Sequence, residues 1–304
     1  MIGIIGSGNV GANTAFFLAE KGVDHVMLYD TREGLAKGKA LDMMEAAPIR
    51  GYRTSIQGTD NPEKVLGADI VIITAGAVRK PGMKRDLLFK ENKEIIESYA
   101  KRITSPQTIV IIVSEPVDLL TTVFARNSSL PRNQIFGLGG ALDATRLRYL
   151  IAKELKVSME NVTAQAVGRH TDDMILLESC CCVSGMSIDN FLSKEKIKEL
   201  FDQTKNAGHL IVELAGRASS YYGPSAVTAE LAEAIVMNPG RLFSVCHMLS
   251  GQFGINDVAI SLPVILGRTG IRKTITPTLT PEEEAILKKS ADLIGKTLEE
   301  ETNE

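Results

Sequence analysis

The sequence has no marked excess of charge and no long apolar run, and both absences exclude classes of protein. Its 34 basic and 37 acidic residues give a formal net charge of -3, which offers no basic surface for nucleic acid or an anionic membrane. No apolar run approaches the roughly twenty residues of a membrane-spanning helix. The apolar N-terminus has no basic segment and is interrupted by glycines, which argues against a signal peptide. We therefore predict neither a nucleic acid nor a membrane as a partner.

Cysteine is also scarce, with four residues in the chain, and its placement excludes further chemistry. Cys180, Cys181 and Cys182 are adjacent, and Cys246 stands alone. Three neighbouring positions suit neither a disulfide framework nor a CxxC metal site. We interpret them as reduced, buried thiols on an apolar strand of a cytoplasmic protein, and we expect no metal site.

The first half of the chain alternates short apolar runs with segments of helical periodicity. The expected strands cover residues 2–5, 25–29, 69–74, 108–113 and 134–138, and the expected helices cover 11–21, 34–47, 86–103 and 118–128. Continuous apolar strands that alternate with helices are typical of a parallel sheet with both faces covered. We therefore predict an α/β fold that begins with a Rossmann-type doubly wound sheet.

The pattern changes near Gly140, where we place a boundary between domains 1–140 and 141–304. The second part is predicted to contain a helix over 142–155, strands over 162–167 and 175–183, a helix over 226–237, strands over 242–249 and 257–266, and a C-terminal helix that begins at Thr280 and Pro281. This mixture indicates an α+β domain.

The segment Gly6-Ser7-Gly8-Asn9-Val10-Gly11 is a GxGxxG motif between an apolar strand and a helix. Gly6 suits the tight turn, Gly8 lets the backbone approach a pyrophosphate, and Gly11 allows close packing of the helix on the sheet. The helix N-terminus also favours negative charge. A glycine-rich turn without a ligand is the alternative, but the strand and helix on either side favour a dinucleotide site.

Asp30 ends the second predicted strand, about twenty residues after the glycines, where a carboxylate accepts hydrogen bonds from the adenosine ribose. A carboxylate there repels a 2′-phosphate, so the sequence favours NAD over NADP as the cofactor. The alternative is a turn or capping residue, and the neighbouring Arg32 would suit a 2′-phosphate.

Three further groups of residues carry charge into the expected ligand edge of the sheet. Four cations, Arg79, Lys80, Lys84 and Arg85, follow the third predicted strand and suit an anionic substrate. Asp143 and Arg146 share one face of a helix, and their spacing alone fits a surface ion pair. His170 follows an apolar strand, and a lone histidine is more often structural than catalytic. Spacing does not decide between these interpretations.

Together these residues resemble the lactate/malate dehydrogenase family, in particular its bacterial and archaeal malate dehydrogenases of lactate-dehydrogenase-like type. The resemblance covers nearly the whole chain and rests on GSGNVG with Asp30, AGAVRKPGMKRDLL, VSEPVD, LDATR, GRHTDD and GQFGINDVAISLPVILG. It implies an NAD-binding domain followed by a substrate and catalytic domain, oxidation of (S)-malate in the tricarboxylic acid cycle, and a homodimer or homotetramer.

The resemblance also implies a role for each site residue. His170 is the expected general base, oriented by Asp143, and Arg146 is expected to bind the C1 carboxylate of the substrate. Arg85 is expected to polarise the C2 oxygen, and Arg79 occupies the specificity position, where an arginine favours a second carboxylate and hence malate over lactate. Asn92 is expected to contact the cofactor, with Val113, Ser114 and Glu115 along the nicotinamide pocket.

Three residues depart from the family pattern. Glu115 stands where the family has an asparagine that contacts substrate and nicotinamide, and its carboxylate would repel an anionic substrate by about 4 kcal/mol at 4 Å. Arg169 and Thr171 flank His170 where the family commonly has an acidic or small residue and a glycine. We expect Arg169 to pair with Glu115 and neutralise it. The departures leave open a dehydrogenase for another 2-hydroxy acid, or a cofactor-binding homologue with weak or lost turnover.

Overall fold

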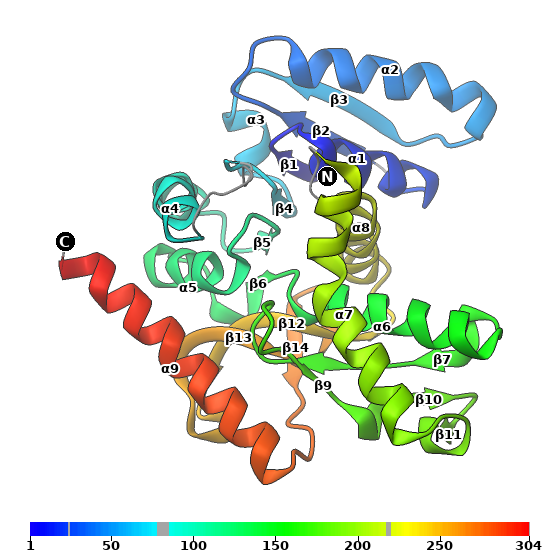
Figure 1. Ribbon diagram of the computed structural model, residues 1–304. Helices are drawn as coiled ribbons and strands as arrows, with labels where there is room; N and C mark the ends of the chain where they lie inside the picture. The colour runs from blue at the N-terminus through cyan, green and yellow to red at the C-terminus, as the bar shows by residue number, and fades with distance from the viewer. Residues whose placement is uncertain (24, 78–84, 217–219, 304) are drawn as a thin grey trace.

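The computed structural model describes residues 1–23, 25–77, 85–216 and 220–303, without the side chains of residues 85–87, 302 and 303 (Figure 1). Within this part, nine strands form one sheet in the order β14-β13-β12-β6-β5-β4-β1-β2-β3. Its strands are β1 (Ile2–Ile5), β2 (His25–Tyr29), β3 (Ser55–Thr59), β4 (Ile70–Ile73), β5 (Ile109–Ile112), β6 (Ile135–Gly137), β12 (Leu242–Ser250), β13 (Asn256–Gly267) and β14 (Gly270–Thr274).

The first six strands are parallel, whereas β12 pairs antiparallel with β6, and β13 and β14 continue antiparallel. The helices are α1 (Asn9–Glu20), α2 (Leu35–Arg50), α3 (Glu63–Leu66), α4 (Arg85–Arg102), α5 (Val117–Asn127), α6 (Gly140–Leu155), α7 (Lys194–Ala215), α8 (Tyr222–Met237) and α9 (Pro281–Asn303). The sheet therefore continues past residue 140, because the C-terminal strands extend it at one edge.

Successive residues of the central strands pack against helices on opposite faces of the sheet. In β4, Ile70 and Ile72 belong to the core that contains side chains of α1, α2 and α8, whereas Val71 and Ile73 belong to the core shared with α4, α5 and α9. This alternation follows from the two-residue repeat of a strand and buries both faces. The predicted doubly wound α/β sheet is confirmed.

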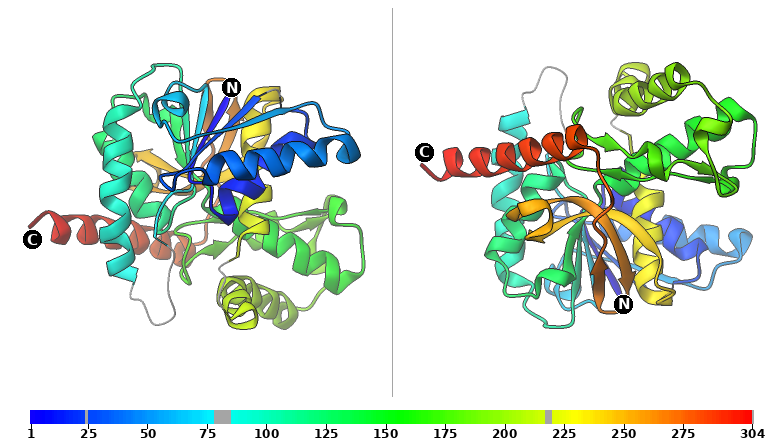
Figure 2. Two further views of the ribbon diagram at one scale, coloured as in Figure 1. Left: turned by 90° about the horizontal axis from the view of Figure 1, so that it is seen from above. Right: turned by 90° about the horizontal axis from the view of Figure 1, so that it is seen from below.

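A smaller lobe lies beside the main sheet, with its own core between α6, α7 and short strands (Figures 1 and 2). Its strands are β7 (Val162–Thr163), β8 (Ala166–Val167), β9 (Ile175–Leu176), β10 (Cys182–Val183) and β11 (Met186–Ser187). β7, β10 and β11 form one sheet and β8 pairs with β9. The loop between β8 and β9 carries His170.

Two sequence expectations in this lobe are wrong. The strands predicted over 162–167 and 175–183 are each interrupted, the second by a 3-10 turn at Glu178–Cys180, where the Cys180 amide donates to the Leu177 carbonyl. The three adjacent cysteines are therefore not on one strand, because only Cys182 lies in β10. All four thiols are free, with Cys181 and Cys246 buried and the other two half-buried.

No prediction covered α3, α7, β3, β11 or β14. The start of α7 is nevertheless visible in the sequence, since the Ser193 side chain accepts a hydrogen bond from the Lys196 amide as an N-cap. β3 is an edge strand in which polar residues alternate with one isoleucine and one glycine, which weakens the apolar signal. Among the helices in the described part of the chain, none is both long and apolar enough to cross a membrane.

The order of strands places the ligand edge of the sheet. β1 lies between β2 and β4, so the connections from β1 and β4 leave in opposite directions at this point. Open α/β sheets bind ligands at such a reversal, outside the carboxyl ends of the strands. Gly6 and Thr74 directly follow β1 and β4 and mark that crevice.

Candidate active site

A cleft of about 1080 Å³ lies at the carboxyl ends of β4 and β5 and extends to α6, α7 and α9. It brings together several predicted site residues: Val10, Asn92, Val113, Ser114, Glu115, Arg146 and His170. The remaining predicted residues with described side chains do not line it: Gly6, Ser7, Gly8, Asn9, Gly11, Asp30 and Asp143. Of these residues Gly8 is half-buried and Asn9 is exposed, whereas the other five are buried.

His170 and Asp143 form the central pair of the site. Asp143 lies in the first turn of α6 and is 1% exposed, and its Oδ2 is 2.8 Å from Nδ1 of His170. A carboxylate accepts, so Nδ1 carries the proton and Nε2 remains available for a ligand in the cleft. The backbone amide of His170 donates to Oδ2 of Asp118, at 2.9 Å. Ring and backbone are thus held by two different carboxylates.

Two carboxylates raise the pKa of His170 to about 9. Burial lowers this pKa, but the charge and hydrogen bond of Asp143 and the charge of Glu115 outweigh burial, and Arg146 opposes them. His247 gives the contrast. Among the described residues, the ring of this buried histidine of β12 contacts the Val245 carbonyl and the Thr274 hydroxyl and no carboxylate, and burial lowers its pKa to about 4. Of these two histidines, His170 is therefore held in the charged form near neutral pH and His247 in the neutral form.

Arg146 shares the cleft with this pair. Its Nη1 lies 3.5 Å from Oδ1 of Asp143, and its side chain is 16% exposed. Within the described residues, that carboxylate oxygen has no hydrogen-bond partner. The guanidinium therefore lies one helical turn from Asp143 and beside the imidazole, with donors left for an anionic ligand.

Glu115 does not pair with Arg169, and this expectation is wrong. Oε2 of Glu115 accepts the Val117 amide at 3.1 Å, and its Oε1 lies 3.6 Å from Nε2 of His170. Arg169 instead donates to Asp173 from Nε and Nη2, at 3.1 and 2.7 Å. Asp173 lies four residues after Arg169 in the same loop, whereas Glu115 follows β5, so the guanidinium binds the carboxylate of its own loop. The group beside Glu115 is the His170 imidazole instead of the expected Arg169 guanidinium.

The glycine motif has the geometry of a phosphate cradle. A Cβ at Gly11 would lie 1.9 Å from the Gly6 carbonyl oxygen, and Gly6 itself has φ of +99° beside Ala75. A Cβ at Gly8 would meet nothing within 4 Å, so the turn presents open backbone before α1. These positions fit a dinucleotide pyrophosphate at the N-terminus of α1.

Asp30 is tied into the same turn. Its carboxylate accepts the Ser7 amide at 2.8 Å and both the amide and Nε of Arg32 at 3.0 Å. Burial would raise the pKa of Asp30, but these hydrogen bonds outweigh burial and lower it. Ser7 is fully buried, with its hydroxyl on the Tyr29 carbonyl, so it supports the turn from below.

Asn92 and Ser114 connect the strand ends that border the cleft. Asn92 of α4 accepts the Ala77 amide at 2.7 Å and donates to the Glu115 carbonyl at 2.6 Å. Ser114 donates to the Ala75 carbonyl at 2.6 Å. The loops after β4 and β5 are therefore held together by Asn92 and Ser114, two side chains that were expected from the sequence to contact the cofactor.

Arg79 lies outside the described residues, and Arg85 is described only as the first backbone position of α4. Sequence analysis also missed Asp118, although its motif was noted, because nothing in VSEPVD signals a bond to a residue 52 positions away. It missed Asp173, the partner of Arg169, for the same reason.

An imidazole with a buried carboxylate partner, an arginine beside it, and a glycine cradle at the strand ends define the class of nucleotide-dependent dehydrogenases. Comparison with known proteins agrees. Residues 1–137 match the family model described as lactate/malate dehydrogenase, NAD binding domain, and residues 140–304 match the model for the alpha/beta C-terminal domain of the same family.

Individual relatives match over nearly their full length. A malate dehydrogenase of Heliobacterium modesticaldum is 40% identical over 295 residues, which cover 96% of each chain. The structure of malate dehydrogenase from Salinibacter ruber superposes with a TM-score of 0.93 at 35% identity and covers 99% of this chain and 97% of that one. Lactate dehydrogenase from Eimeria maxima, solved with NADH and oxamate, gives 0.94 at 31% identity over 99% and 93%. The chain belongs to the lactate/malate dehydrogenase family.

Proposed function

We propose that this protein is an NAD-dependent malate dehydrogenase, which catalyses the reversible oxidation of (S)-malate to oxaloacetate. The observation that carries the proposal is the 2.8 Å contact between His170 and Asp143 in a cleft that Arg146 also lines. Relatives named malate dehydrogenase at about 40% identity over nearly the whole chain support the substrate. They do not favour a different 2-hydroxy acid or a homologue without turnover.

The residues of this chain divide the work as follows. Nε2 of His170 takes the proton of the 2-hydroxyl group during oxidation and returns it during reduction. Asp143 orients the imidazole and stabilises its charged form, as a buried carboxylate does in other acid-base pairs. Arg146 binds the C1 carboxylate through a two-point fork. Arg85 polarises the C2 oxygen, and Arg79 binds the second carboxylate of malate.

The cofactor site is proposed to consist of Asn92, Val113, Ser114, Glu115, Asp30 and residues 6–11. NAD, when bound, supplies the acceptor for the hydride of C2. Gly8 leaves the turn open to the pyrophosphate, and the Asp30 carboxylate faces the ribose hydroxyls. In this division, residues 1–140 bind the cofactor, whereas 141–304 carry the acid-base pair and Arg146.

We also propose that the chain forms a homodimer or homotetramer in the cytoplasm. Large apolar side chains are exposed on α2 and α8, where Leu41 is 62%, Ile49 89% and Met237 71% exposed. Such side chains are typical of surfaces that a second copy covers. Light scattering at several concentrations measures the mass, and a monomer throughout would exclude this assembly.

Steady-state oxidation of NADH with a panel of 2-oxo acids tests the proposed function. Oxaloacetate is expected to give the highest kcat/KM, well above pyruvate, because oxaloacetate carries a second carboxylate and pyruvate does not. Equal use of both acids would exclude the malate assignment. A preference for a longer 2-oxo acid would assign the enzyme to that acid instead.

A further inference from the structure

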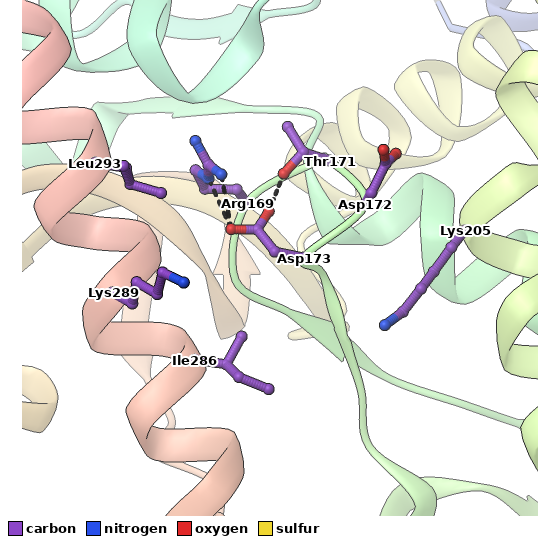
Figure 3. A pocket seen from close by; sticks show the side chains of 8 residues that line it. All are labelled: Arg169, Thr171, Asp172, Asp173, Lys205, Ile286, Lys289 and Leu293. Atoms are coloured by element: carbon purple, nitrogen blue, oxygen red, sulfur yellow. Dashed lines mark hydrogen bonds and ion pairs between the residues drawn. The ribbon is translucent and has the colours of Figure 1, made fainter.

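Asp173 is the centre of a hydrogen-bond network around the catalytic loop, and the described function does not use it. Its carboxylate accepts two bonds from Arg169 and one from the Thr171 hydroxyl (Figure 3). These two residues directly precede and follow His170. Asp173 therefore fixes both neighbours of the catalytic histidine at once.

A third partner comes from the other end of the chain. Ser290 of α9 is 1% exposed, and its hydroxyl donates to the same Asp173 oxygen that receives Arg169. Leu287 and Ile294, on the turns of α9 before and after Ser290, are buried in a core that also contains Val167 and Ile175 from the strands beside the loop. The bond between Ser290 and Asp173 thus joins the loop to a helix that is already packed against its base.

The same helix borders the active-site cleft at its far end. Thr297, Glu300 and Glu301 line the cleft, and Glu301 lies 3.5 Å from Lys90 of α4. Figure 2 shows α9 extending from beside the smaller lobe toward α4. One helix therefore contacts both the loop of the acid-base residue and the helix that carries Asn92.

The other hydrogen bonds of the loop hold His170 and the backbone, whereas Asp173 binds the side chains of Arg169 and Thr171. The His170 backbone is held by Asp118 and its ring by Asp143, but neither bond restrains the residues on either side. The loop between β8 and β9 is seven residues long. Its backbone is held at Gly168, which pairs with Ser261 of β13, and by two turn bonds, from the Thr171 amide to the Arg169 carbonyl and from the Met174 amide to the Thr171 carbonyl. The Asp173 network adds side-chain restraints on Arg169 and Thr171 to these backbone bonds.

We propose that Asp173 is a positioning residue, which holds His170 in line with Asp143 by binding Arg169 and Thr171 and by anchoring them to Ser290 of α9. Arg169 and Thr171 are two of the three departures from the family pattern, and they share one partner. The two departures therefore belong to one hydrogen-bonded arrangement around Asp173, and they are not two separate losses of family residues. The proposal rests on the proposed function only for its activity measurement.

Asp173→Asn is the direct test, with Asp172→Asn as its matched control. Asp172 is the adjacent carboxylate, is 73% exposed, and lies 3.9 Å from Nε2 of His209. Small misplacement of a catalytic group lowers the rate strongly, so Asp173→Asn should lower kcat with oxaloacetate and NADH by about 10- to 100-fold. KM for oxaloacetate and the Kd for NADH should change by less than about 3-fold, since the groups that bind both ligands remain.

Ser290→Ala removes one bond of the network and changes no charge. It should lower kcat in the same direction by about 2- to 10-fold, and this fall cannot come from an unneutralised Arg169. A loss of Tm without a loss of kcat below the melting transition would assign Asp173 and Ser290 to stability alone and overturn the proposal. Equal losses in Asp172→Asn and Asp173→Asn would overturn it as well.

Proton NMR gives a readout that needs no turnover. The Nδ1 proton of His170, bonded to Asp143, should give a far-downfield resonance in the unmodified protein and in Asp172→Asn. The resonance should shift or disappear in Asp173→Asn. An unchanged resonance in Asp173→Asn would reject the positioning role. If the unmodified protein turned over no 2-oxo acid, the proposed function would fail, and this resonance would still decide the role of Asp173.

Discussion

Glu115 lies on the free side of the His170 imidazole, with 3.6 Å between Oε1 and Nε2. The ring thus stands between two carboxylates, because Asp143 binds Nδ1. The neighbouring imidazolium balances the charge of Glu115, so Glu115 need not repel an anionic substrate as an isolated carboxylate would. The C2 oxygen of a substrate is expected to take the place of Glu115 beside Nε2.

The first prediction concerns the pH dependence of Glu115→Gln. Reduction of oxaloacetate needs protonated His170 as the acid, so this activity is present below the raised pKa of about 9 and is lost as the pH rises through it. Removal of the Glu115 charge should lower the pKa of His170, and the alkaline limit of kcat/KM should move to lower pH. Glu300→Gln is the control, since Glu300 also lines the cleft. The same limit in all three proteins would show that Glu115 does not act on His170.

The second prediction concerns the choice between dicarboxylate and monocarboxylate substrates. Arg79→Gln removes the partner of the second carboxylate, so the preference for oxaloacetate over pyruvate should fall by about 2 to 5 kcal/mol if the pair is desolvated. Lys80→Gln removes a neighbouring cation and should leave the preference nearly unchanged. A preference that survives Arg79→Gln would place the specificity elsewhere.

The third prediction concerns the cofactor. Asp30→Ser removes the carboxylate that repels a 2′-phosphate and releases Arg32, which now donates to Asp30 at 3.0 Å. The ratio of kcat/KM for NADPH to that for NADH should therefore rise. The double variant Asp30→Ser with Arg32→Ala should lose part of that gain, because the released guanidinium is gone. Comparable use of both cofactors by the unmodified protein would show that Asp30 does not face the ribose.

Much of the fold was predictable because the central strands are short, continuous and apolar. Strands such as β4 and β5 read as uninterrupted runs of isoleucine and valine, which only a sheet buried on both faces requires. The small lobe was harder to predict. Its strands are two residues long, too short for any periodicity to develop, and its core depends on contacts with α7.

In the candidate site, too, some contacts could be predicted from the sequence and others could not. The association of Asp143 with His170 was expected from the family resemblance, and the structure places them 2.8 Å apart. The partner of Arg169 was mistaken because charge alone suggested Glu115, whereas local chain geometry brings Asp173 closer. The contribution of Ser290 could not be predicted, since a buried serine on an amphipathic helix shows no partner in the sequence.

The most direct test of the account is oxaloacetate reduction by His170→Asn, with NADH binding measured by fluorescence in the same preparation. In His170→Asn, kcat is expected to fall by about two to four orders of magnitude while the Kd for NADH stays nearly unchanged, because only the proton donor is lost. His209→Asn, which alters another histidine of the cleft, should keep its turnover. Undiminished turnover in His170→Asn would contradict the account.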